Sequence, residues 1–139
     1  MRKITYSTAN QFTEEQLEKL FLSVSWESGK HPDKLVRAMK HSYVVSAWDE
    51  DRLVGLVRGL DDDSTVAFLH YLLVDPEYQG RHIADTLMHM ILDHYREKEL
   101  LYIKIMPSDP KTIPFYERYG FACYDNYTAM QLNIEYMKE

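Results

Sequence analysis

The sequence predicts an α/β (α+β) fold in one domain, with a central mixed, mostly antiparallel sheet of about six or seven strands and helices on both faces. The first observation is the order of the expected elements, β-α-α-β-β-β-α-β-α-β-β, which is typical of a sheet covered by helices. The second is the size, because 139 residues suffice for only one ordinary domain. The third is the composition, 45% hydrophobic and 27% charged, which is typical of a globular chain. We therefore expect residues 1–139 to form a single domain.

The first part of the chain is expected to form one short strand and two helices. Residues 4–7 alternate in polarity, as a strand does. Thr13 and Gln16 have the spacing of a capping box, in which each side chain accepts from the backbone N–H of the other residue, so a helix begins there. Pro32 suits the first position of a second, shorter helix over residues 33–40, because the amide it lacks would have no partner there.

Alternation with period two then replaces the helical spacing. Residues 43–48 and 53–60 flank the acidic turn 49–51, and we expect them to form a hairpin. Residues 66–74 form the most apolar of the expected strands. Pro76 ends that strand, because proline has no N–H to donate to a sheet.

The rest of the chain is expected to add two helices and three strands. Apolar side chains recur at every fourth position over residues 80–98, which predicts a long amphipathic helix. The remaining elements are a strand at 101–105, a short helix at 112–119, and two closing strands at 121–127 and 130–136.

Charge and cysteine content exclude several classes of function. The chain has 16 Lys and Arg against 22 Asp and Glu, a net charge of −6, which argues against nucleic acid or an anionic membrane as the main partner. Cys123 is the only cysteine, so neither an intrachain disulfide nor a cysteine-cluster zinc site is possible. Neither a signal peptide nor a run of about 20 apolar residues is visible, so we expect a cytoplasmic protein.

The segment from residue 72 to residue 87 carries the chemistry. It consists of an apolar strand, a tight loop and the start of an amphipathic helix. The first turn of a helix has unpaired N–H groups and the positive end of the helix dipole, which suits a phosphate or pyrophosphate. The loop lacks the Lys-Ser/Thr pair of a P-loop and the G-x-G-x-x-G pattern of dinucleotide folds.

Two motifs resemble those of the GNAT superfamily of N-acetyltransferases. Residues 74–84, V-D-P-E-Y-Q-G-R-H-I-A, are similar to the acyl-CoA pattern Gln/Arg-x-x-Gly-x-Gly/Ala of that family. Residues 114–121, P-F-Y-E-R-Y-G-F, are similar to its second motif near the C-terminus. Because both motifs occur in the right order and spacing, the resemblance covers nearly the whole chain and implies a GNAT-like domain.

The resemblance implies acetyl-CoA as co-substrate, with its pyrophosphate held by backbone amides of the loop and the first helical turn. These residues are Gln79, Gly80, Arg81, His82, Ile83 and Ala84. Backbone groups of Leu72 and Val74 would hold the pantetheine arm and the acetyl carbonyl, and Asp109 would lie near that arm. His82 replaces the first fixed glycine of the pattern, so its side chain would either crowd the pyrophosphate or donate to a phosphate oxygen.

A closer resemblance is to the small branch that includes plant and cyanobacterial serotonin N-acetyltransferases. It rests on Trp26 and on residues 32–35, 42–45 and 74–80. That branch has an aspartate where this chain has Tyr71, next to His70, and this departure bears directly on the acceptor.

Transfer of an acetyl group to an amine requires a base for the amine and an acid for the leaving thiolate. Tyr116 matches the family tyrosine that protonates the sulfur, and a phenol with a pKa of about 10 is protonated at neutral pH; a packing residue, as most of the 11 tyrosines must be, is the alternative. His70 is the candidate base, since an imidazole titrates near neutral pH; a satisfied histidine in a buried strand is the alternative. Alternation predicts that the neighbouring Tyr71 points to the opposite face. Asp75 and Glu77 rank lower as bases.

These residues predict an acetyl-CoA-dependent N-acetyltransferase that transfers the acetyl group directly, in a ternary complex, to a primary amine on a small molecule or a protein. The negative net charge favours a cationic amine. The alternative is a non-catalytic module that binds acyl-CoA or another protein. No metal site is expected, because His89 and His94 are five residues apart and do not share a helix face. Closing strands of this fold often pair between subunits, so a homodimer is possible.

Overall fold

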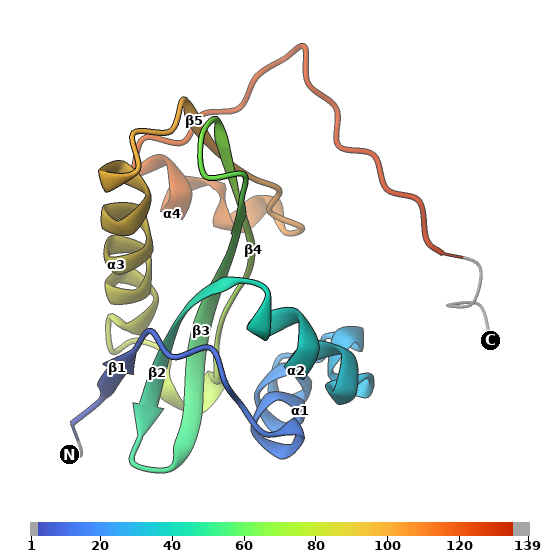
Figure 1. Ribbon diagram of the computed structural model, residues 1–139, viewed down its shortest axis with the longest axis vertical. Coiled ribbons are helices and arrows are strands. Elements are labelled where there is room, and N and C mark those ends of the chain that lie inside the picture. The colour runs from blue at the N-terminus through green and yellow to red at the C-terminus, as the bar shows by residue number, and fades with distance from the viewer. Residues whose placement is uncertain (1–2, 135–139) are drawn as a thin grey trace. The chain divides into compact units, whose positions relative to one another are not determined.

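A five-stranded sheet organises the first of two units in the computed structural model, which describes residues 3–134 (Figure 1). The first unit extends through Ile105 and the second begins at Met106. The strands follow one another in chain order across the sheet. Their bounds are β1 Thr5–Ser7, β2 Tyr43–Asp49, β3 Arg52–Asp61, β4 Val66–Val74 and β5 Tyr102–Ile105. β1 to β4 pair antiparallel and β5 pairs parallel to β4, so the expectation of a mixed, mostly antiparallel sheet is confirmed.

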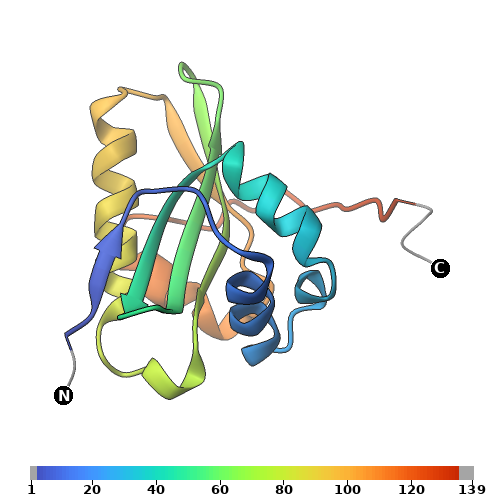
Figure 2. The ribbon, with the colours of Figure 1, turned by 60° about the horizontal axis from the view of Figure 1, so that its bottom comes forward.

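Helices α1 (Glu14–Ser23) and α2 (Pro32–Lys40) cover one face of this sheet (Figure 2). The predicted capping box starts α1: Thr13 Oγ1 accepts from the N–H of Gln16 at 3.1 Å, and Gln16 Oε1 accepts from the N–H of Thr13 at 2.9 Å. The apolar side chains of both helices pack on the sheet in one buried cluster. Its members are Phe12, Leu17, Leu20, Phe21, Leu35, Met39, Val44, Leu53, Leu56 and Leu73.

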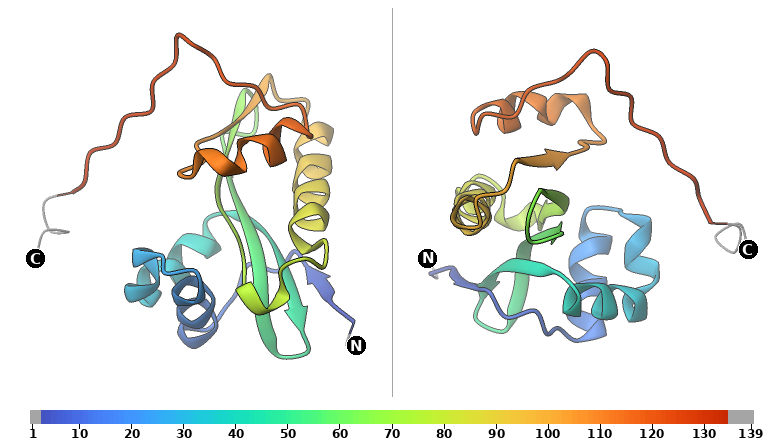
Figure 3. Two further views of the ribbon diagram at one scale, coloured as in Figure 1. Left: turned by 180° about the vertical axis from the view of Figure 1, so that it is seen from behind. Right: turned by 45° about the horizontal axis from the view of Figure 1, so that its top comes forward.

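Helix α3 (Ile83–Glu97) covers the opposite face and connects β4 to β5, a crossover that a parallel pair requires (Figure 3). Its buried face is made by Ile83, Leu87, Met88, Ile91, Leu92 and Tyr95. Two glycines of β3 let this helix approach. A Cβ atom at Gly59 would lie 2.2 Å from Oη of Tyr95, and one at Gly55 would lie 3.3 Å from Cγ2 of Ile83. Positions 55 and 59 therefore both face α3.

The number of strands is smaller than predicted. The part of the chain that the structure describes contains five strands, not six or seven, because residues 121–134 form no strand. In this segment the backbone N–H of Tyr127 donates to the carbonyl of Tyr124, so a turn occupies part of the first expected closing strand. An alternating pattern makes a strand only where a neighbour supplies hydrogen-bond partners. The last two residues of the second expected closing strand, 135 and 136, lie outside the described residues.

The second unit contains the short helix α4 (Ile113–Glu117), preceded by a 3₁₀ turn at Pro110–Thr112. Gly120, at φ 98°, adopts a left-handed conformation that suits glycine, and the helix ends before it. Among the described residues, every helix is too short or too polar to cross a lipid bilayer.

Candidate active site

A bulge in β4 shapes the first part of the site. The ladder between β3 and β4 pairs Arg58 with His70. The next pair joins Val57 to Leu72, so Tyr71 is an extra residue without a partner on β3. Its φ is 68°, in the left-handed region that non-glycine residues rarely adopt. An extra residue in this conformation is the geometry of a β-bulge, and bulges are frequent beside active sites because they redirect side chains.

The bulge reverses which side chains of β4 face α3. Leu69 pairs with Gly59 and Val74 pairs with Gly55, and both glycine positions face α3. Side chains five residues apart cannot share a face in a regular strand, whose period is two. Because of the extra residue, Leu69 and Val74 both face α3. Leu73 lies on the other side of the sheet, in the buried cluster beneath α1 and α2.

The predicted orientation of Tyr71, on the face opposite to His70, is wrong. The rings of these two residues stack, with their centroids 3.9 Å apart and their planes at 26°. The left-handed backbone at the bulge breaks the alternation on which the prediction depended. Tyr71 is held there by an edge-on contact with Phe21 (4.9 Å between centroids) and by a hydrogen bond of 3.0 Å between its hydroxyl and that of Ser28.

Beyond the bulge, one edge of β4 is open. Pairing with β5 covers only Val66–Leu69, and within the described residues no other strand pairs with this edge of β4. The N–H of Asp75 donates to the carbonyl of Val54 on β3 at 2.8 Å. Because backbone groups of successive strand residues point to alternate edges, those of Leu72 and Val74 point to the open edge. The side-chain amide of Gln79 donates to the carbonyl of Val74 at 3.3 Å. The backbone groups of Leu72 face the edge of β4 beyond Leu69, where the pairing with β5 ends.

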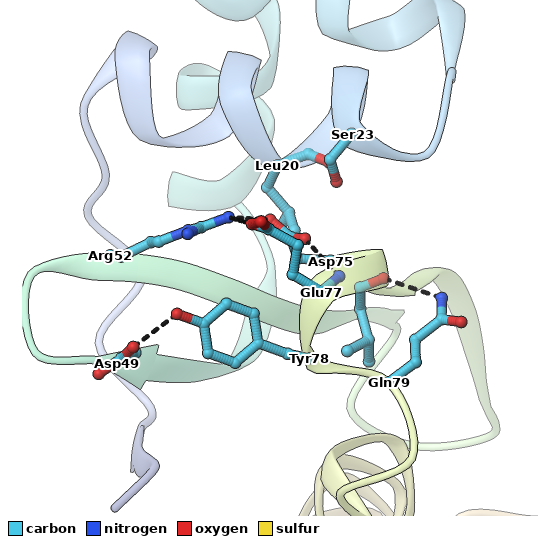
Figure 4. Close-up of polar contacts among 9 residues, drawn as sticks. Leu20, Ser23, Asp49, Arg52, Asp75, Glu77, Tyr78 and Gln79 are labelled. Atoms are coloured by element: carbon cyan, nitrogen blue, oxygen red, sulfur yellow. Dashed lines mark hydrogen bonds and ion pairs between the residues drawn. The ribbon is translucent and has the colours of Figure 1, made fainter. Parts of the chain in front are cut away.

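An ion-pair network fixes the loop that follows β4 (Figure 4). The buried carboxylate of Asp75 accepts from the N–H of Glu77 at 2.9 Å, which closes the turn at Pro76–Tyr78. Arg52, at the start of β3, donates to Asp75 at 2.8 Å and to Glu77 at 2.6 Å. These two hydrogen bonds raise the pKa of the Arg52 guanidinium above its ordinary value. Asp75 and Glu77 therefore have structural partners, which supports their lower rank as bases.

Tyr78 anchors the same loop to the β2–β3 hairpin. Its hydroxyl donates to Asp49 at 2.5 Å, and both residues are buried. The guanidinium groups of Arg52 and Arg81 lie 5.0 Å and 5.3 Å from the centre of its ring, within the range of cation–π contacts. The backbone that leads to Gly80 is thus held on two sides before α3 begins.

The start of α3 leaves backbone amides without partners in the helix and contains one unusual residue. The first backbone bond of the helix runs from the N–H of Thr86 to the carbonyl of His82, at 3.1 Å, so the amides of Ile83 and Ala84 have no partner in the helix. His82 has φ 61° and ψ 21°, the left-handed conformation, and its side chain makes no capping hydrogen bond. The position at which the family pattern has glycine therefore needs a positive φ. Of the predicted amides, that of Gln79 already donates to Pro76 at 3.4 Å.

His70 lies on the α1–α2 face and contacts an arginine that the sequence pattern did not single out. NH1 of Arg58 lies 2.7 Å from Nδ1 of His70, and Nε of Arg58 donates to Oγ of Ser42 at 2.8 Å. Because a guanidinium is always a donor, Nδ1 accepts and the neutral imidazole carries its hydrogen on Nε2. Burial, together with the charge of Arg58, lowers the pKa of His70 below its ordinary value of 6.5. In the sequence, the feature that could have pointed to Arg58 is a charged residue within an otherwise apolar strand.

The aromatic residues Trp26, Trp48 and Tyr43 have separate contacts and do not form one pocket. Trp26 lies 6.0 Å from Tyr71, measured between ring centroids. Trp48 stacks on Phe12 at 6.1 Å, and Tyr43 stacks on His94 of α3 at 3.5 Å. Of the three aromatic residues Trp26, Trp48 and Tyr43, Trp26 is the one that contacts the bulge.

The other two predicted site residues belong to the second unit. Tyr116, in α4, is buried, and its ring makes edge-on contacts with Phe115 and Phe121. Burial raises the pKa of the Tyr116 phenol above its ordinary value of 10. Asp109 is exposed, and its carboxylate accepts from the N–H of Lys111 at 3.0 Å, which caps the 3₁₀ turn. In residues 3–134, no group of three or more His, Cys, Asp or Glu side chains is arranged to hold a metal ion.

The match to a known family is extensive. A model of the acetyltransferase (GNAT) family matches residues 7–121, which include both motifs, the bulge and the start of α3. Among solved structures, a GNAT-family acetyltransferase from Streptococcus pneumoniae aligns with a TM-score of 0.80 and 28% identity over 96% of this chain and 100% of that chain. A putative GNAT acetyltransferase from Xanthomonas campestris aligns with a TM-score of 0.78 and 26% identity over 95% of both chains.

Curated relatives are longer than this chain. An uncharacterized N-acetyltransferase, ycf52, of Porphyra purpurea is 28% identical over 87% of this chain and 71% of its own length. A histone acetyltransferase, TAP1, of Glycine max is 25% identical over 87% of this chain and 57% of its own length. The chain thus spans between about half and three quarters of the length of these relatives.

Proposed function

Because the chain belongs to the acetyltransferase (GNAT) family, we propose that it is an acetyl-CoA-dependent N-acetyltransferase that transfers the acetyl group directly to a primary amine in a ternary complex. One observation carries the proposal: the bulge at Tyr71 leads without interruption to the open edge of β4, the anchored loop and the start of α3. A thioester arm needs backbone partners along a strand edge, and a pyrophosphate needs unpaired amides at a helix start. The first unit presents both in sequence.

The residues present fit acetyl-CoA. Amides of the loop and of Ile83 and Ala84 would hold the pyrophosphate, and the backbone groups of Leu72 would hold the thioester arm. When bound, acetyl-CoA supplies an activated acetyl group, so the chain needs no serine or cysteine nucleophile of its own. Asp109 would act on the arm through its backbone or through exposed parts of its carboxylate, since one oxygen already caps a turn.

Tyr116 is the proposed general acid. A phenol whose pKa is raised by burial is protonated at every pH at which an enzyme normally works, so it has a proton to give to the leaving thiolate. The contacts of its ring with Phe115 and Phe121 fix the direction of the hydroxyl within the second unit.

His70 is the proposed base, with a basicity that Arg58 reduces. The hydrogen bond from Arg58 occupies Nδ1, and Nε2 already carries the ring hydrogen, so proton uptake requires that the contact with Arg58 breaks. A lowered pKa keeps the imidazole neutral at pH 7, which a base requires, but makes it a weaker acceptor of the proton.

The experiment combines acetyl-CoA binding with thiol release from a panel of amines. Binding should raise the unfolding free energy by about 2–3 kcal/mol at a hundredfold excess over Kd. Arylalkylamines come first in the panel because of the resemblance to serotonin N-acetyltransferases, and a lysine peptide is included because one relative is named a histone acetyltransferase. Binding without thiol release from any amine would refute the enzyme and favour the alternative, a non-catalytic acyl-CoA-binding module.

A further inference from the structure

Arg58 is a partly buried positive charge that pairs with no carboxylate of residues 3–134. It lies in β3 on the face covered by α1 and α2, and its side chain is intermediate in exposure. Its polar contacts are with Ser42 and His70, and its guanidinium lies 5.5 Å from the ring centre of Tyr71. Within the described residues it forms no ion pair with a carboxylate. Arg52, in the same strand, instead pairs with Asp75 and Glu77.

The guanidinium of Arg58 has more hydrogen-bond donors than its contacts with Ser42 and His70 use. It has five N–H groups, and among the described residues one donates to Ser42 and one to His70, so three remain for another partner. Burial disfavours its charged form, as the lowered pKa of Arg58 shows, yet arginine stays charged in proteins. A partly desolvated charge that only neutral groups contact is costly to the fold. An anion that binds there would offset that cost.

A purely structural role does not explain this arrangement. Ser42 already donates to the carbonyl of Ala38 at 2.6 Å, and a neutral donor would satisfy the oxygen of Ser42 equally well. The contact with His70 disfavours protonation of the imidazole, because burial and the charge of Arg58 lower the pKa of His70. Contacts with one hydroxyl and one imidazole do not require the planar, forked donor geometry of a guanidinium.

The position of Arg58 relates this cation to the proposed reaction. It pairs with His70 directly before the bulge, and Leu72, whose backbone groups point to the open edge, follows directly after it. Tyr71, the residue of the bulge, contacts both Arg58 and His70 with its ring. Arg58 lies on the neighbouring strand β3, next to Val57, the partner of Leu72. Strand spacings of about 3.4 Å per residue and about 4.8 Å between strands put the backbones of Arg58 and Leu72 about 6 Å apart, so an acceptor amine near Leu72 has this cation on the adjacent strand.

We infer that the acceptor is an amine that also carries an oxyanion, a carboxylate or a phosphate, which Arg58 binds. The inference rests on the proposed function and names its substrate class. Arg58 provides the planar fork that matches such groups, and no carboxylate of the described residues competes for it. The negative net charge of the chain, by contrast, favours a cationic amine only through its general field.

Matched pairs of amines test the inference in the full-length protein. Each pair consists of an amine with and without the oxyanion: phenylalanine against phenylethylamine, tryptophan against tryptamine, 4-aminobutyrate against butylamine, and phosphoethanolamine against ethanolamine. The kcat/KM for thiol release should be about tenfold to hundredfold higher for the anionic member of the preferred pair, the usual effect of a hydrogen-bonded charge. The pairs with carboxylates and the pair with a phosphate distinguish the two oxyanions.

Variants then assign the preference to Arg58. Arg58→Met should abolish it by lowering kcat/KM for the anionic member alone, and Arg58→Lys, which keeps the charge without the fork, should retain part of it. Arg96→Met is the matched control, since Arg96 lies on the exposed side of α3 and pairs with Asp93 at 3.4 Å. Acetyl-CoA binding verifies that each variant is folded.

The possible results separate the inference from the proposed function. An anionic preference that Arg58→Met removes and Arg96→Met keeps would support the inference. Acetylation of amines with no anionic preference in the unmodified protein would overturn it and leave the proposed function intact, and that result needs no variant to fold. A preference that survives Arg58→Met would also overturn it. If no amine of any pair releases thiol, the proposed function fails and the inference fails with it.

Discussion

His82 gives the sharpest test of how the loop that we propose binds acetyl-CoA is built. At φ 61° an L-residue has a steric cost of about 1–2 kcal/mol, because its Cβ approaches the following carbonyl. Glycine avoids that cost but loses more chain entropy on folding, about 0.5–1 kcal/mol. Alanine keeps the Cβ and has no imidazole, as glycine has none. We therefore expect His82→Gly to be more stable than His82→Ala by about 0.5–1 kcal/mol.

The measurement is urea unfolding of both variants, with thermal unfolding as a second method. For a domain of this size the difference corresponds to about 2–4 °C in Tm. His89 supplies the matched control, because it is an exposed residue inside α3 with no positive φ. There the order should reverse, with the glycine variant less stable than the alanine variant by about 1 kcal/mol.

Titration with acetyl-CoA extends the comparison to function. Both substitutions at position 82 remove the imidazole, and only glycine removes the Cβ beside the amides of α3. We expect the glycine variant to bind acetyl-CoA more tightly than the alanine variant, because the side chain no longer crowds the loop. Equal stabilities of the two variants would refute the assignment of a strained left-handed residue. An equal loss of affinity in both would instead assign a phosphate contact to the imidazole.

Three further substitutions test the chemistry and the packing. Tyr116→Phe should lower kcat at least tenfold with unchanged acetyl-CoA affinity, as loss of a general acid does, whereas Tyr119→Phe should leave kcat unchanged. The kcat/KM of the unmodified protein should rise with pH through a value below 6.5 and then level off, because a base with a lowered pKa is protonated only in acid. His70→Gln should abolish this rise, and an unchanged pH profile in that variant would exclude His70 as the base. Gly59→Ala should destabilise the fold by about 1–3 kcal/mol in urea with an unchanged m-value, because the new Cβ would lie 2.2 Å from Oη of the buried Tyr95; an unaltered midpoint would contradict the packing of α3 on β3.

The elements before Ile105 could be predicted because their signals are local. The capping box of Thr13 and Gln16, the proline at the start of α2 and the fourfold spacing of α3 each depend on residues within one or two turns. The expected strand over residues 66–74 coincides with β4. In these segments, the secondary structure that the local sequence favours is also the one that buries the apolar side chains.

The features that the sequence did not reveal depend on residues far apart in the chain. The bulge at Tyr71 is defined by its register against β3, and no local pattern marks it. The role of Arg58 requires knowledge of which side chains lie across the ladder from it. The closing strands failed for a related reason: alternation over residues 121–127 shows what a strand could bury, and it does not supply a neighbouring strand.

The bulge also has a consequence for the order in which the chain folds. A left-handed Tyr71 is intrinsically unfavourable, so the bulge must be maintained by tertiary contacts, with Phe21 of α1 and with Ser28 after it. Before those residues dock, the ladder between β3 and β4 is free to continue in regular register. A slip of one residue would exchange the faces of every later side chain and move Leu73 from the α1–α2 cluster toward α3. The docking of α1 thus selects the register of the strand edge that we propose holds acetyl-CoA, and we expect acetyl-CoA binding to be among the last properties to return on refolding.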